Sequence, residues 1–190
     1  MTWSCSDRPR LRDRGYRLAT CALAVLLFPV ARMVAPGHAR YVACQWALAA
    51  RFPHEDLVGL TPAARAAFTA ARTRALWPHG VLIGLTSGYR DAGVQERLFR
   101  AEVYRSGSSA AARLRTLPPA ESRHVAGTAM DVRPAEGARW LELHGGRHHL
   151  YRVYDNEWWH FEYRPEGPPP RLPHPGAQRT DSRLAGQELV

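Results

Sequence analysis

Four residues in two short stretches of this 190-residue chain have the types and spacing for metal-assisted hydrolysis. His124 and Asp131 form the first group, and Glu157 and His160 form the second. Two imidazoles and one carboxylate are a three-ligand set that leaves a catalytic zinc ion one open position for water. Glu157, just before the last histidine, is placed to act as general base on that water.

The same residues also have an ordinary structural explanation. The chain contains nine histidines, so some proximity of histidine and aspartate is expected by chance. His144, His148 and His149 illustrate the problem, because they cluster in sequence although neighbouring residues of a strand point to opposite faces. We assign these three to a polar surface. The spacing of these residues alone does not distinguish a metal site from a chance arrangement.

Three ordered blocks of sequence between residues 60 and 164 carry a family resemblance. They read Ser87-Gly88-Tyr89-Arg90 followed by Gln95, then Ser122-x-His124-x-x-Gly127-x-Ala129-x-Asp131, then Glu157-Trp158-Trp159-His160. Together they resemble peptidase family M15, the zinc D,D-peptidases of the VanY-type D-alanyl-D-alanine carboxypeptidases and the related VanX-type D-Ala-D-Ala dipeptidases. The resemblance implies that His124, Asp131 and His160 bind Zn2+ and that Glu157 is the catalytic base and later the acid.

The resemblance also implies roles for three further polar residues. Arg90 would face the scissile carbonyl, where a fixed guanidinium stabilises the developing oxyanion by about 3–4 kcal/mol. Ser122 would help to hold the terminal carboxylate of the substrate. Gln95 would support the site without touching the substrate. Gly127 lets the backbone turn between the first ligand and the strand that carries Asp131.

The implied activity is hydrolysis of the terminal D-Ala-D-Ala bond of peptidoglycan stem peptides by a zinc carboxypeptidase. Trp158 replaces a proline that is common in the carboxypeptidase branch, so a D-Ala-D-Ala dipeptidase and a peptidoglycan endopeptidase stay as alternatives. The short interval between Asp131 and His160 favours an open cleft that admits long peptides. A non-catalytic, zinc-dependent cell-wall-binding module is the alternative of another class, and it would not need Glu157.

The positive charge of the chain is concentrated at its N-terminus. All 26 basic residues are arginine against 17 acids, a net charge of +9, and five of the arginines precede an uncharged run over residues 18–31. A basic segment followed by an apolar one is the order of a secretory signal, and this run is shorter than the ~20 residues of a transmembrane helix. We expect cleavage after Ala35 or Ala39, with an uncleaved signal anchor as the alternative.

Removal of residues 1–39 takes away six arginines and two acids and leaves a charge of +5. The remaining arginines are scattered among acids and no nucleic-acid recognition motif is present, so we expect no nucleic-acid partner. Of the three cysteines only Cys44 remains, which excludes an internal disulfide in the processed chain. We expect a monomer that is exported to the bacterial cell envelope or the medium and that contacts a membrane only through an uncleaved N-terminal segment.

Periodicity and turn residues predict an α+β fold in which a small antiparallel sheet carries the zinc site and packs against several helices. The expected domains are a signal peptide or anchor at 1–39, a zinc D,D-peptidase domain at 40–164 and a disordered Pro-rich tail at 165–190. Asp91 should cap a helix that turns Val94, Leu98 and Val103 toward the core. The other expected helices span 62–76, 108–117 and 136–144, and the expected strands span 81–86, 128–132 and 158–163.

Overall fold

A four-stranded antiparallel sheet forms the centre of the protein, which was analysed as a computed structural model that describes residues 11–177. The strand order is β1-β2-β4-β3. The strands are β1 (Gly84–Ser87), β2 (Ala129–Arg133), β3 (Leu150–Arg152) and β4 (His160–Tyr163). The predicted α+β fold with a small antiparallel sheet is therefore confirmed.

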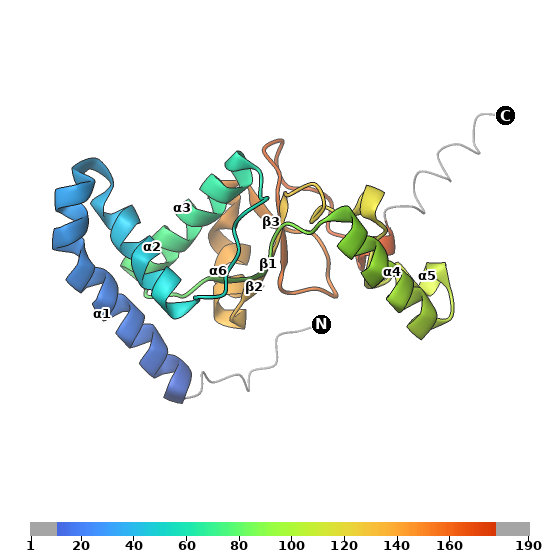
Figure 1. Ribbon diagram of the computed structural model, residues 1–190, viewed down its shortest axis with the longest axis horizontal. Helices are drawn as coiled ribbons and strands as arrows, with labels where there is room; N and C mark the ends of the chain where they lie inside the picture. The colour runs from blue at the N-terminus through green and yellow to red at the C-terminus, as the bar shows by residue number, and fades with distance from the viewer. Residues whose placement is uncertain (1–10, 178–190) are drawn as a thin grey trace.

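Helices lie at both ends of the sheet. Figure 1 shows α1, α2, α3 and α6 gathered at one end and α4 and α5 at the other, with the strands between them. The helices are α1 (Leu11–Val34), α2 (Ala39–Arg51), α3 (Pro62–His79), α4 (Ala92–Ser106), α5 (Ser109–Ala112) and α6 (Ala135–His144). Short 3-10 turns add Pro36–His38, Pro119–Glu121, Gly145–His148 and Pro175–Ala177.

Side-chain caps begin three of the helices. The Thr61 side chain accepts a hydrogen bond from the amide of Ala64 at the start of α3. The side chains of Asp91 and Ser108 accept hydrogen bonds from backbone amides in the first turns of α4 and α5. Gly80 caps the C-terminus of α3 in the left-handed conformation, with φ 62°, and the helix ends at His79, three residues beyond its expected end. Local chemistry therefore fixes where these helices begin and where α3 ends.

The main core lies on one face of the two central strands. Met130 and Val132 of β2 are buried there with Phe161 of β4, and Phe68 of α3 packs in the same cluster. Alternation along β2 sends Asp131 to the opposite face of the sheet. The strand that supplies a candidate metal ligand is therefore held rigid by the apolar residues on either side of that ligand.

The predicted core face of α4 is wrong. Val94 and Leu98 are 37% and 44% exposed, and Gln95 is the buried residue of the helix. Helical spacing of apolar residues does not distinguish a face packed on the core from one that lines a cleft, and α4 lines a cleft. The expected helix over 108–117 is also too long, because α5 has four residues.

Several elements were not expected from the sequence. Helix α2 packs along α1, and Ala31 and Ala43 are both fully buried at this contact. Strand β3 also went unpredicted. Residues 165–177 form an irregular segment, ending in the 3-10 turn Pro175–Ala177, that hydrogen-bonds to the body of the protein, with the Leu172 amide donating to the Val153 carbonyl at 2.9 Å. Residues 178–190 of the expected tail lie outside the described part, and the proposed domain boundaries stay predictions.

Candidate metal and catalytic site

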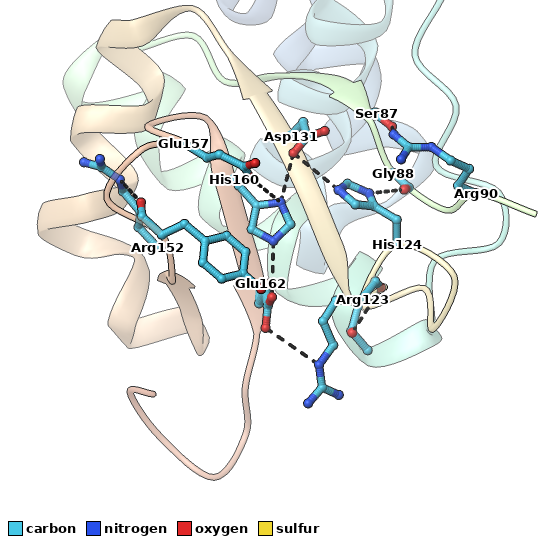
Figure 2. A network of polar contacts seen from close by, with 12 residues as sticks. Ser87, Gly88, Arg90, Arg123, His124, Asp131, Arg152, Glu157, His160 and Glu162 are labelled. Atoms are coloured by element: carbon cyan, nitrogen blue, oxygen red, sulfur yellow. Dashed lines mark hydrogen bonds and ion pairs between the residues drawn. The ribbon is translucent and has the colours of Figure 1, made fainter. Parts of the chain in front are cut away.

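The structure brings together the residues that the three sequence blocks supplied. Asp131 lies in the middle of β2, and His160 opens the neighbouring strand β4 directly opposite it. His124 comes from the loop before β2, and Glu157 from the turn before β4. Figure 2 shows their side chains converging on one face of the sheet. Antiparallel pairing of β2 with β4 is therefore what assembles the site.

Two histidines and one aspartate form a compact cluster with metal-binding geometry. One ligand atom from each of His124, Asp131 and His160 lies within 4.8 Å of the other two. The Asp131 Oδ1 atom is 3.4 Å from His124 Nε2 and 3.1 Å from His160 Nδ1. Nitrogen and oxygen donors in this number suit zinc with one position left open.

The second ring nitrogen of each histidine has its own partner. His124 Nδ1 is 2.7 Å from the carbonyl oxygen of Gly88, which can only accept, so Nδ1 carries the proton and Nε2 is free to bind a metal. His160 Nε2 lies 3.2 Å from a carboxylate oxygen of Glu162, so Nδ1, which faces Asp131, is the nitrogen of this ring placed to bind a metal. Partners of this kind orient metal-ligating histidines. The donor set therefore fits a metal ion.

The charge around His160 also favours a cation. Burial would lower the pKa of His160, but hydrogen bonds to Asp131 and Glu162 outweigh it and raise that pKa to about 10. The pKa of Asp131 is held well below its ordinary value, because hydrogen bonds from the two histidines overcome the opposing effect of burial. An environment that stabilises positive charge on an imidazole also stabilises a dication at the same place.

Glu157 lies beside the cluster without being part of it. Its Oε2 atom is 3.8 Å from His160 Nδ1, and its side chain is largely buried. Burial raises the pKa of Glu157 to about 7; the charge of His160 opposes the shift, and those of Asp131 and Glu162 add to it. A carboxylate with a pKa near neutrality both takes and returns a proton efficiently, as a general base and acid must.

Arg90 is fixed at the edge of the same site. Its guanidinium donates to Ser87 Oγ at 2.9 Å and to Gln95 Oε1 at 2.7 Å, and its backbone amide donates to the carbonyl of His124. Gln95 is buried and also donates to the carbonyl of Leu117. Gln95 therefore supports the guanidinium of Arg90 and also lies in the cleft wall.

A cleft of about 420 Å³ opens over these residues. Its walls include Arg90 and Ser122, as expected from the sequence, together with Trp159 and α4. Trp158 instead packs against the core. This volume lies within the range of small-ligand sites in proteins.

Two residues at the site were missed in the sequence. The ring of Tyr154 lies 5.1 Å from that of His160 and is buried in the cleft wall. Glu162 contacts the far side of the His160 ring. Glu162 lies two residues after His160, so alternation along β4 puts both on the same face, and that spacing was the available signal. No sequence feature indicated Tyr154.

The family model for VanY, D-alanyl-D-alanine carboxypeptidase, matches residues 59–166, which is more than half of the chain. The chain belongs to this family. It is a peptidase, and the match spans every member of the site from Ser87 to Glu162. The M15 resemblance of the three sequence blocks is thereby confirmed. No match was found among curated proteins.

Solved structures support the VanY fold. A VanY D,D-pentapeptidase from a VanB-type resistance cassette, in complex with Zn(II), is 23% identical, with a TM-score of 0.50 over 57% of this chain and 76% of the other. VanYB in complex with D-alanine-D-alanine is 22% identical, with a TM-score of 0.50 over 55% of this chain and 71% of the other. The LD-carboxypeptidase LdcB is 19% identical, with a TM-score of 0.52 over 73% and 71%. At these identities the likeness concerns the fold.

Gly127 makes the turn that leads from His124 into β2. It has φ +68°, and a Cβ atom there would lie 2.4 Å from the backbone oxygen of Gly59. We expect Gly127→Ala to lower the free energy of unfolding by more than the roughly 1–2 kcal/mol of left-handed strain alone. Urea denaturation measures this, and Gly107→Ala is the control, because its φ is +81° with open space around it. Equal losses in the two variants would contradict the steric argument.

Proposed function

We propose that this VanY-family protein is a zinc-dependent D-alanyl-D-alanine carboxypeptidase that removes the terminal D-alanine from peptidoglycan stem peptides. The observation that carries the proposal is Glu157, a buried carboxylate with a pKa near 7 placed beside a His-Asp-His cluster. A metal-dependent wall-binding module has no use for a base at this position. The open cleft with α4 as its wall supports a peptide substrate over a free dipeptide.

His124, Asp131 and His160 would hold the zinc ion. Bound there, zinc supplies a Lewis acid that polarises the scissile carbonyl and lowers the pKa of a water molecule. Glu157 takes the proton from the attacking water and returns it to the leaving amine. Arg90, fixed by Ser87 and Gln95, donates to the oxygen that becomes negative in the transition state.

Ser122 is proposed to bind the terminal carboxylate of the substrate. It is nearly buried in the cleft wall, close in sequence to His124. A hydroxyl donor there stabilises the carboxylate in the ground state and the transition state alike, so its loss should raise KM and leave kcat largely unchanged. This assigns Ser122 to substrate binding and not to the chemical step.

Release of D-alanine from a muramyl pentapeptide tests the proposed reaction. Parallel assays with free D-Ala-D-Ala and with a cross-linked peptide dimer separate the carboxypeptidase from a dipeptidase and an endopeptidase. Preference for pentapeptide supports the proposal, whereas preference for either other substrate replaces it. Cell-wall sedimentation with no cleavage of any of the three would identify the binding module instead.

Metal content is expected to follow the histidine ligands. The parent should bind about one equivalent of zinc and lose D-alanine release in a chelator, with recovery when zinc is added back. His124→Ala should retain well under one equivalent, because two ligands hold the ion much less strongly than three. Metal analysis of untagged protein measures this, with His148→Ala as a control outside the cluster. Equal zinc in both variants would remove His124 from the ligand set.

Export through the N-terminal segment is part of the proposal. Helix α1 is long and apolar enough to cross a membrane, by length and composition, over Arg12–Val34. Its outer side chains include exposed Leu26 and Met33, while Ala24 and Ala31 face inward. A chain that acts on peptidoglycan must leave the cytoplasm, and arginines before an apolar helix suit a signal peptide or a signal anchor.

Processing of the exported chain distinguishes the signal peptide from the anchor. We expect the mature protein to begin at Pro36 or Arg40, whereas an anchor would leave the full chain in the membrane fraction. Mass spectrometry of the envelope protein measures this. Leu26→Arg should block export by charging the apolar run, and Leu143→Arg, at an equally exposed leucine of α6, should not. Normal export of the Leu26 variant would contradict a signal function for α1.

A further inference from the structure

Glu162 is a buried acid behind the metal cluster that the proposed reaction does not use. It lies on β4 two residues after His160, and its solvent exposure is 0%. One carboxylate oxygen, Oε1, is 3.2 Å from His160 Nε2. The other, Oε2, accepts from Arg164 at 2.8 Å from Nε and 2.7 Å from Nη2. Figure 2 shows the carboxylate next to the imidazole on the side away from Asp131.

The two partners of Glu162 contact different oxygen atoms of its carboxylate. A buried carboxylate needs paired charge or hydrogen bonds on its oxygens, and Arg164 satisfies one oxygen from two of its nitrogens. That pairing fixes the rotamer and leaves Oε1 directed at the imidazole. Arg123 is the more distant third cation, at 3.9 Å and on the exposed side. The acid is therefore held in place independently of any metal.

We propose that Glu162 is a positioning residue that reserves His160 Nδ1 for the zinc ion. A neutral imidazole carries one proton, and a carboxylate oxygen beside Nε2 holds that proton there. Nδ1 then presents its lone pair toward Asp131 Oδ1 and His124 Nε2, the other two candidate ligand atoms. The carboxylate also increases the basicity of the ring as a ligand. This inference rests on the proposed zinc site and adds to it a residue that binds no metal itself.

Zinc affinity and ligand geometry test the inference without relying on activity. Glu162→Gln keeps the shape of the side chain but removes the charge, and Glu162→Asp keeps the charge but withdraws it from the ring. Both should raise the zinc dissociation constant by about 10–100-fold in chelator competition. Both should also shift the visible bands of the cobalt-substituted protein. Glu162→Asp retains an anion for Arg164, so it keeps the test valid if Glu162→Gln does not fold.

A stability control separates positioning from a purely structural role. Leu150→Ala removes a buried side chain from β3, whose Leu150 pairs with Tyr163 of β4, and it should lower the melting temperature without changing zinc affinity. Zinc affinity within twofold of the parent in both Glu162 variants would overturn the inference. So would an equal loss of affinity in Leu150→Ala. A parent protein that binds no zinc would instead overturn the proposed function itself.

Discussion

Glu157→Gln is expected to reduce kcat for D-alanine release by about 10³-fold, within the range of a lost general base. Glutamine fills the same volume and accepts hydrogen bonds but takes no proton from water. Because Glu157 lies 3.8 Å from His160 and outside the ligand cluster, zinc content should stay near one equivalent. A large loss of kcat with retained metal is the specific signature of a base.

The measurement is steady-state release of D-alanine together with metal analysis of the same preparations. Glu96→Gln is the matched control, since Glu96 is an exposed acid on α4 paired with Arg100. It should behave as the parent does. A kcat within tenfold of the parent for Glu157→Gln would assign the proton transfer to another group, and loss of the metal would make Glu157 a ligand.

The residues of the candidate site could be predicted from the sequence, but the groups that hold them in place largely could not. His124, Asp131, His160 and Glu157 stand in ordered blocks, so their meeting at one place followed from the family resemblance. The contact of His124 with the Gly88 carbonyl involves a backbone atom, which leaves no trace in residue type. The hydrogen-bond partner of the other histidine nitrogen depends on which loop lies beside the ring, and tertiary packing determines that position.

The fold shows the same division between local and tertiary information. Caps at Thr61 and Asp91 were predictable because they satisfy amides within the next few residues. The exposure of the apolar side chains of α4 was not predictable. Apolar residues recur at the same helical spacing whether their face packs on a core or lines a cleft. Strand β3 has only three residues, which is too few for an alternating pattern to be recognised in the sequence. It directly follows His149, which adopts the left-handed conformation.

The buried ion pair between Arg72 and Glu55 is the other feature whose removal should have a large effect. Arg72 of α3 is 1% exposed, and its Nη1 lies 2.8 Å from Glu55 Oε2. The second oxygen of Glu55 accepts from the backbone amide of Leu85 in β1. The pair therefore ties a helix and the loop before it to the strand that leads into Arg90. Arg72→Met should lower the free energy of unfolding by about 3–5 kcal/mol, because it leaves an unpaired buried carboxylate.

A double variant tests whether the uncompensated charge is the cause. Glu55→Gln removes the charge and keeps an acceptor for Leu85, so Arg72→Met with Glu55→Gln should be more stable than Arg72→Met alone. Urea denaturation of both singles and the double gives the coupling directly. Arg100→Met, which breaks an exposed pair on α4, should cost no more than about 1 kcal/mol. If the double variant is as unstable as Arg72→Met, the decrease in the free energy of unfolding arises from lost packing around the arginine and not from the unpaired carboxylate of Glu55.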